Sequence, residues 1–480
     1  MQSLLALSGG EVVARAIGFI ATAYLARSLG PAAFGIVGFA YALAGYFSLT
    51  IHQGFLDIGS RAVAREPGKA LRLAVSGTVV RLVLALGLFI ALTATAWILD
   101  KPLTVKLAVM IMGLSTFALA LDTSWVYKGL ERNRLVGLAL VIGQGLYLLV
   151  VLTAVHGPAD VLFVPSAMVL GEFSAALLLG FFLLRAGRVR FHIKDGLELL
   201  KASGFPTLGI IFRSLIFTFD VVLIGLLMGS SAVGVYSASY RIVFLLLAIS
   251  IAIKAAYLPS VTRAAESGPA QVATAASRSV ELSSAIGFPA VIGGIVLATP
   301  LLNAVFGSDY VEGARAFQVL LLSIGFVFLS EPLHNVFVAC NKLKQETAII
   351  GTAAGLNILL NIVLIPRFGM VGAAIATAAA EGLLLVVGLT YIYRLGVKIS
   401  LVPLFRAVLL AGLMGLPVAL VDTDGLGTYV GLIASVALGV GAYAAVVVIF
   451  RGVPKDLEPM LGPTLNKITH KLRPGSVSAP

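Results

Sequence analysis

The chain has 480 residues, of which 59% are hydrophobic and 12% are charged, and its net charge is +12. Soluble domains are about 45–50% apolar and about 25% charged, so the composition excludes an ordinary water-soluble fold and predicts an all-α, polytopic membrane protein. The single cysteine, Cys340, excludes an internal disulfide and a multi-cysteine metal site.

Apolar runs bounded by charges, glycine and proline predict about fourteen transmembrane helices, each near the roughly 20 residues that cross a bilayer. The first run carries Glu11 and Arg15, so it is expected to be a retained helix and not a signal peptide. In chain order the predicted spans are 8–29, 35–57, 76–99, 103–126, 135–155, 160–184, 203–228, 232–257, 280–306, 315–340, 346–366, 370–393, 401–421 and 428–450.

Basic residues gather in alternate connections, which predicts the orientation of the chain. One set of alternating loops, together with the C-terminal end, holds 23 of the 34 Lys and Arg residues, whereas the opposite loops hold about five. Short cytoplasmic loops collect basic residues, so both termini are expected in the cytoplasm and the protein in the cytoplasmic membrane. This placement also argues against nucleic-acid binding. Residues 451–480 are expected to form a disordered tail.

A repeat is visible at an offset of 199 residues, where the turns after the first and seventh predicted helices match: Gly30 with Gly229, Ala33 with Ala232, Gly35 with Gly234 and Tyr41 with Tyr240. Glu172 and Glu381 match in the same way at an offset of 209 residues. Six helices separate equivalent points, so the copies are expected to be parallel repeats. This predicts lobes at 1–202 and 203–394, two further helices within 395–450, and the tail. Alternatively, small residues recur only because helix packing favours them.

Several strings resemble the polysaccharide-export flippases of the multidrug/oligosaccharidyl-lipid/polysaccharide exporter superfamily. Residues 25–35 (LARSLGPAAFG) are similar to that family's first turn, and residues 357–366 (NILLNIVLIP) with 369–377 (GMVGAAIAT) are similar to its helix 11–12 hairpin. Asp220 and residues 234–241 (GVYSASYR) resemble its seventh and eighth helices. The resemblance implies an O-antigen-unit-like flippase for polyprenyl-diphosphate oligosaccharides, with alternating access. Helices 13 and 14 resemble an extension found in some members.

Arginines inside the spans are candidates for binding a diphosphate, because a guanidinium can bind two phosphate oxygens at once. Arg241 lies about 13 Å from the outer end of its helix and has no charged neighbour at i±3 or i±4; Arg213 likewise has no partner at that spacing. Arg15 and Arg241 also stand where lipid II flippases carry arginines. Arg15 could instead pair with Glu11, and the other two with residues of other helices.

Intramembrane carboxylates and one histidine are candidates for coupling to Na⁺ or H⁺. Glu331 and His334, three residues apart on one helix, are a candidate proton relay. The other candidates are Asp220, Glu172 and Glu381. Hydrogen bonding at a structural position is the alternative for Glu172, Glu381 and His334. Lys254, Arg81 and Arg406 are expected to reach the cytoplasmic interface by snorkelling. No catalytic residue, cofactor or metal site is expected.

The function expected is therefore translocation of lipid-linked oligosaccharides, with membrane lipids, glycan polymerases and glycosyltransferases as partners. A multidrug or cation antiporter and a lipid II flippase are alternatives within the superfamily. Ala21 and its neighbours stand where lipid II flippases have a further arginine, which argues against lipid II. A membrane glycosyltransferase or polymerase is a rival from another class, although the outward loops are too short to carry its catalytic residues. Phosphate-binding loops and zinc helices have no match in the sequence.

Overall fold

The computed structural model describes residues 2–185, 187, 191–421, 427–450, 452, 454 and 456, and within these ranges every regular element is a helix. The all-α prediction is confirmed. The α-helices in chain order are α1 (Gln2–Arg65), α2 (Ala70–Ile98), α3 (Leu103–Gly113), α4 (Ser115–Leu121), α5 (Ser124–Gly129), α6 (Asn133–Ala154), α7 (Phe163–Leu184), α8 (Ile193–Leu227), α9 (Ser230–Ala264), α10 (Pro269–Val296), α11 (Ala298–Phe306), α12 (Ala314–Ala339), α13 (Leu343–Arg394), α14 (Val402–Ala419) and α15 (Thr428–Ile449).

Among the described residues, twelve helical ranges are long and apolar enough to cross a membrane. The two longest each contain a glycine whose backbone leaves the helix: Gly30 in α1, with φ 68° and ψ 172°, and Gly369 in α13, with φ 56° and ψ −137°. Glycine suits both positions because side chains disfavour positive φ. The count of fourteen requires each broken helix to be counted as two and stays a prediction.

Two predicted spans differ most from the structure. The span expected at 280–306 is instead α10, which begins at Pro269 and ends at Val296, followed by the short α11. Hydropathy missed the first turns of α10 because they bury the small apolar Val272, Ala273 and Ala276 beside Arg278. The span expected from 203 begins at Ile193, because α8 continues beyond its apolar part.

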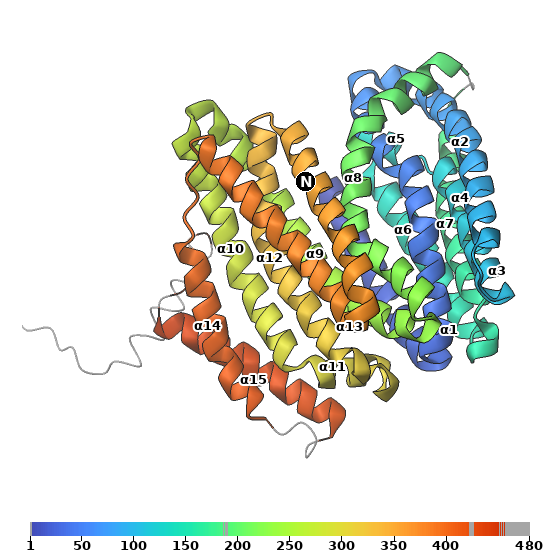
Figure 1. Cartoon of the computed structure of the whole chain (residues 1–480). Coiled ribbons are helices and arrows are strands. Elements are labelled where there is room, and N and C mark those ends of the chain that lie inside the picture. The colour runs from blue at the N-terminus through green and yellow to red at the C-terminus, as the bar shows by residue number, and fades with distance from the viewer. Residues whose placement is uncertain are drawn as a thin grey trace, which may run out of the picture. The chain divides into compact units, whose positions relative to one another are not determined.

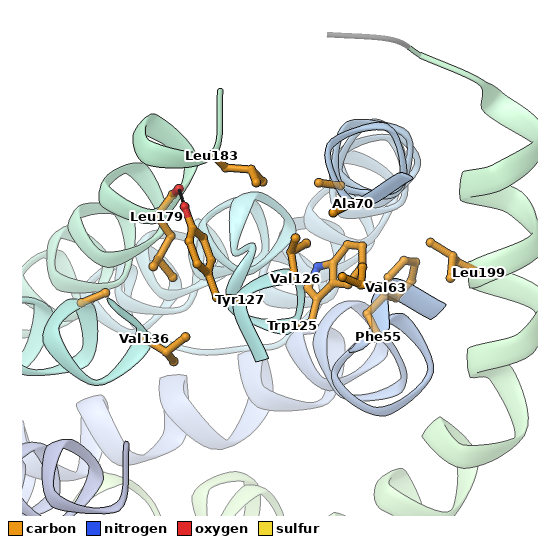
Figure 2. Packing of buried hydrophobic residues seen from close by; sticks show 12 residues of the cluster. Phe55, Val63, Ala70, Trp125, Val126, Tyr127, Val136, Leu179, Leu183 and Leu199 are labelled. Atoms are coloured by element: carbon orange, nitrogen blue, oxygen red, sulfur yellow. Dashed lines mark hydrogen bonds between the residues drawn. The ribbon is translucent and has the colours of Figure 1, made fainter. Parts of the chain in front are cut away.

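The chain forms two compact units, Met1–Ala238 and Ser239–Pro480, and the division falls inside α9. The core of the first unit is built around Trp125 on α5, whose side chain is fully buried (Figure 2). A Cβ atom on Gly59 would lie 2.5 Å from the Trp125 ring. The Tyr127 hydroxyl donates to the Leu179 carbonyl at 2.8 Å, which ties α5 to α7. These contacts fix the end of the broken helix that α3, α4 and α5 form.

In the second unit, α10 packs against α12 and α14, and α12 packs against α13 (Figure 1). Two helix prolines leave backbone carbonyls without their usual i+4 donor, and hydroxyls of other helices replace it. The Ser283 hydroxyl on α10 donates at 2.5 Å to the Phe328 carbonyl, four residues before Pro332 of α12. The Tyr443 hydroxyl on α15 donates at 2.7 Å to Ala285, four residues before Pro289 of α10.

The turns matched at the offset of 199 have the same backbone conformation and pack against each other. Gly30 and Gly229 both have positive φ, 68° and 89°. A Cβ atom on Gly35 would lie 1.7 Å from the Ser230 carbonyl oxygen, and one on Gly234 would lie 1.9 Å from that of Pro31. Because Pro31 corresponds to Ser230 and Gly35 to Gly234, the contact is reciprocal, as at a twofold axis. The sequence match at the offset of 199 residues is thus also a structural repeat.

A second structural repeat occurs at an offset of 210. Glu131 and Asn341 have φ of 59° and 56°, and none of the other described non-glycine residues has a positive φ. The N–H of Arg132 donates to the Tyr127 carbonyl, and the N–H of Lys342 to the Phe337 carbonyl, both at 2.8 Å. These are Schellman caps, in which a left-handed residue ends a helix. The helix ending in each cap therefore occupies the same place in both copies.

Candidate functional site

Asp220 lies on α8 inside the first unit and is fully buried. Its Oδ2 accepts a hydrogen bond of 2.7 Å from the Tyr236 hydroxyl on α9, and its Oδ1 accepts one of 2.8 Å from the N–H of Val221. A buried carboxylate needs such donors, because burial without them costs several kcal/mol. Asp220 therefore links α9 to α8, the helix that also carries the candidate residue Arg213.

A short chain of hydroxyls continues along α8 from Asp220 toward α1. The Thr218 hydroxyl lies 2.7 Å from that of Tyr46 on α1 and 3.4 Å from that of Ser214. The Thr218 hydroxyl also bonds to the Ser214 carbonyl at 2.8 Å. Ser214 and Thr218 are four residues apart and share one face of α8, where the Thr218 hydroxyl meets Tyr46 of α1.

Arg213 lies two turns before Asp220 and is half-buried. Its guanidinium carbon is 5.1 Å from the centre of the Phe217 ring, one turn along α8. The search for charged neighbours at i±3 and i±4 did not consider this aromatic partner, with which the arginine makes a cation–π interaction.

Arg241 lies on α9 in the second unit and is half-buried. The preceding residue, Tyr240, is buried, stacks on Phe244 with ring centres 5.3 Å apart, and places its hydroxyl 3.5 Å from that of Thr377 on α13. Glu381 follows Thr377 by one helical turn and is fully buried. Three polar side chains of the second unit therefore lie buried within apolar helices, namely Tyr240, Thr377 and Glu381. Arg241 directly follows Tyr240 in the chain.

Arg15 and Glu172 lie elsewhere in the first unit. Arg15 is exposed on α1, and the described residues offer it no ion pair, so the alternative pairing with Glu11 is not formed. Glu172 on α7 lies near the Ser115 hydroxyl on α4, and its Oε2 is buried without a hydrogen-bond partner among the described residues.

Glu331 and His334 both lie on α12, but each pairs with a residue of another helix. Glu331 Oε2 is 2.5 Å from the Lys254 Nζ of α9. The Nδ1 atom of His334 is 2.8 Å and 3.0 Å from the two carboxylate oxygens of Glu346, in the first turn of α13. The expectation that Lys254 snorkels is wrong, because a carboxylate on α12 lies within its reach.

Arg81 is also placed differently from the prediction. It is 0% exposed, and it bonds backbone carbonyls of Ile51 at 3.1 Å, Asp122 at 2.9 Å and Leu119. The guanidinium carbon lies 5.0 Å from the centre of the Phe55 ring. The snorkelling prediction fails because the break between α4 and α5 leaves carbonyls that need donors. Arg406, in contrast, is exposed and donates to the Phe450 carbonyl.

The predicted disordered tail lies outside the described residues except at Gly452, Pro454 and Asp456. Asp456 accepts a hydrogen bond from the Tyr257 hydroxyl of α9 and lies 3.6 Å from Arg278 of α10. Within the described ranges, no group of three or more His, Cys, Asp and Glu side chains is arranged to hold a metal ion.

Twelve helical ranges among the described residues that are long and apolar enough to cross a membrane, together with the repeated turn and helix cap, define a polytopic membrane protein. The structure of the lipid II flippase MurJ in its inward closed conformation has the same fold, with a TM-score of 0.79 over 92% of this chain and 98% of that one, at 14% identity. The chain belongs to the polysaccharide biosynthesis protein family, whose model matches residues 1–264. A second family model, MatE, matches residues 207–363.

Two relatives from Haloferax volcanii share parts of the sequence. The probable flippase AglR is 24% identical over 383 residues, which cover 77% of this chain and 78% of AglR. The probable low-salt glycan biosynthesis flippase Agl15 is 30% identical over 167 residues. That second match covers 33% of this chain and 34% of Agl15, so the chain aligns with about a third of the length of this relative.

Proposed function

We propose that this protein is a flippase, and not an enzyme, that moves polyprenyl-diphosphate oligosaccharides or polysaccharide repeat units across the cytoplasmic membrane by alternating access. The observation that carries the proposal is family membership across residues 1–264, together with a match to the probable flippase AglR that extends over most of both chains. The transporter fold supports it independently, because a fold of this kind moves a solute without altering its covalent bonds.

Arg241, Arg213 and Arg15 are the proposed contacts for the diphosphate. Two of them are half-buried within apolar helices, where charged residues are rare and mark the paths of substrates or ions. A diphosphate headgroup accepts paired hydrogen bonds from guanidinium groups. Arg15, exposed on α1, is proposed to meet the headgroup before or after it crosses.

Coupling to a Na⁺ or H⁺ gradient is proposed to involve the membrane carboxylates Asp220, Glu172, Glu381 and Glu331 and the imidazole of His334. Their placement supports this role, because Asp220 and Glu381 are fully buried and His334 contacts a carboxylate directly. Buried groups of this kind change charge state or cation occupancy when their surroundings change.

The proposal also includes the domain organisation and the topology of the chain. It has lobes at 1–202 and 203–394, two further helices, and both termini in the cytoplasm. Its support is the repeat and the alternation of basic loops. Glycosyltransferases that build the lipid-linked unit and a polymerase that uses it are the proposed partners.

A multidrug or cation antiporter is the second candidate, because the MatE model matches residues 207–363. Cationic drugs require an acidic cavity, whereas the half-buried Arg213 and Arg241 favour an anionic cargo. A lipid II flippase shares the fold and remains an alternative cargo assignment.

The test is reconstitution of the purified protein into liposomes that carry a fluorescent polyprenyl-diphosphate oligosaccharide. We expect the protein to expose labelled lipid from the inner leaflet to a membrane-impermeant quencher. The same liposomes loaded with a fluorescent cationic drug, and others carrying lipid II, separate the alternatives. Transport of the drug without movement of either glycolipid would reject the flippase assignment.

A further inference from the structure

The helix that ends in the Schellman cap loses backbone hydrogen bonding at the same position in both repeat copies, through a break in the first unit and a proline in the second. Applying the offset of 210, Asp122 corresponds to Pro332. In the first unit α4 ends at Leu121, Asp122 is extended with ψ 120°, and α5 begins at Ser124. In the second unit Pro332 lies inside α12 and has no N–H for the Phe328 carbonyl. In both copies, backbone hydrogen bonding is therefore lost about two and a half helical turns before the cap.

The interruption in the first unit is held by groups that keep their charge. Arg81 binds the carbonyls of Leu119 and Asp122 on one side and of Ile51 in α1 on the other. The Asp122 side chain in turn accepts hydrogen bonds from the Ser124 N–H at 2.9 Å and the Ser124 hydroxyl at 2.6 Å. Arginine stays protonated in proteins and carbonyls do not titrate, so this brace does not respond to pH.

In the second unit, side chains on both sides of α12 make contacts with neighbouring helices close to Pro332. Toward α9, Glu331 pairs with Lys254, and the Asn335 amide donates to the Lys254 carbonyl at 2.8 Å. Toward α13, His334 pairs with Glu346. The side chains of Glu331 and Glu346 are only 11% and 15% exposed, so solvent screens these pairs less than surface pairs.

The charged groups around His334 are few and can be named by helix. Glu346 faces it from α13, whose N-terminal dipole favours the charged carboxylate; Lys342 and Lys344 stand at the start of the same helix. Lys254 and Glu331 come from α9 and α12. On α10, Arg278 lies 3.6 Å from Asp456, and Glu281 interacts electrostatically with Tyr257. Asp309, Glu312 and Arg315 lie about 30 Å away, at the other end of α12.

We propose that His334 and Glu346 form a proton-operated clamp on α12, which makes α12 the moving helix of the second unit, while Arg81 keeps its counterpart in the first unit fixed. With a proton on His334, the imidazolium and the carboxylate attract each other and hold α12 to α13. Loss of that proton leaves a hydrogen bond from a neutral imidazole to the carboxylate, which is weaker than the ion pair, and the segment of α12 after Pro332 is released. The Lys254–Glu331 pair stays charged and limits the movement on the α9 side.

The clamp deepens the proposed function and rests on it, since a proton would then set the transport rate. Histidine commonly titrates between pH 5 and 8. We therefore expect flipping in liposomes with equal pH on both sides to be about fivefold slower at pH 5.5 than at pH 8, the ratio that about 1 kcal/mol produces. His334→Arg, which stays charged, should be slow at every pH, and the rate of His334→Gln should not depend on pH. Lys254→Met should change the rate but keep the pH dependence.

A second readout needs no transport. Cys340 is the single cysteine and lies in the turn between His334 and Glu346, so a fluorophore on it reports the clamp. Its emission should change with pH in the wild type and in Lys254→Met, but not in His334→Gln. Titration that persists in His334→Gln would overturn the clamp. If the emission titrates as expected but no glycolipid moves at any pH, the flippase assignment fails and the clamp stands.

Discussion

The Tyr443 hydroxyl donates a hydrogen bond to the Ala285 carbonyl, the acceptor that Pro289 leaves without a backbone donor. This contact joins α15, near the end of the chain, to α10. α15 packs mainly against α14 and α11, while side chains such as Val430 and Ile433 on its other faces are exposed. The hydroxyl bond adds a polar contact with α10 to this packing.

Tyr443→Phe is expected to destabilise the protein by about 1 kcal/mol, the usual net value of a hydrogen bond. Pro289→Ala restores a backbone donor to Ala285, so Tyr443→Phe should cost much less in that background. Thermal unfolding of the four variants in detergent forms a double-mutant cycle. Equal costs in both backgrounds would contradict this explanation of the contact.

Gly35→Ala is expected to destabilise the protein by roughly 1–3 kcal/mol or prevent folding, because the new methyl group would overlap the Ser230 carbonyl. Gly234→Ala should act alike through Pro31. Gly45→Ala is the matched control, since a methyl group added there would meet no atom within 4 Å. The measurement is the midpoint of thermal unfolding, and a Gly35→Ala protein as stable as Gly45→Ala would refute the reciprocal packing.

Arg81→Met should strongly destabilise the first unit, because each buried carbonyl left without a donor costs roughly 1–3 kcal/mol. Arg81→Lys should recover part of the loss, since an ammonium has donors but not the geometry of the guanidinium. Arg367→Met, at an exposed arginine, is the control. Yield and unfolding midpoint after purification are the measurements; a mild effect of Arg81→Met would show that water replaces the guanidinium.

Arg241→Ala, inserted normally in the membrane, is expected to lower the flipping rate at least tenfold, because the diphosphate loses a bidentate partner. Arg241→Lys should retain part of the rate. Arg406→Ala, which removes an exposed arginine outside the proposed contacts, should leave transport near the wild-type level. Full activity of Arg241→Ala in the liposome assay would remove Arg241 from the proposed binding residues.

Cys340 offers a test of orientation. We expect a membrane-impermeant maleimide to label it in inverted vesicles and not in intact cells, since its turn carries Lys342 and Lys344. Burial raises the pKa of the Cys340 thiol, and nearby Lys342 lowers it by less. The thiolate fraction is therefore small at pH 7, and labelling should speed up toward pH 9. Labelling from outside intact cells would reverse the proposed topology.

Composition and hydropathy were enough to predict the fold class, because the bilayer demands apolar helices whatever their packing. Helix limits were less predictable: the first turns of α10 are small and polar in sequence, yet buried by their neighbours. The matched glycines at 30 and 229 were recognisable because only glycine readily takes their backbone conformation.

The partners of the membrane charges could not be predicted in the same way. Hydropathy gives the depth of a residue but not what it faces. Arg81 binds carbonyls that become available only because α4 ends at Leu121, and Lys254 meets Glu331 from a helix 77 residues later in the chain. Spacing rules along one helix find neither contact, and they also overlook an aromatic partner such as Phe217.

The reciprocal packing of Gly35 and Gly234 limits how far the two halves of a duplicated sequence can diverge. A larger residue in one copy collides with the main chain of the other, and no compensating change of side chain can remove a carbonyl oxygen. Substitutions can accumulate separately in helices that meet lipid, but not at this contact. Such a constraint explains why the repeat can be recognised in the sequence at this turn.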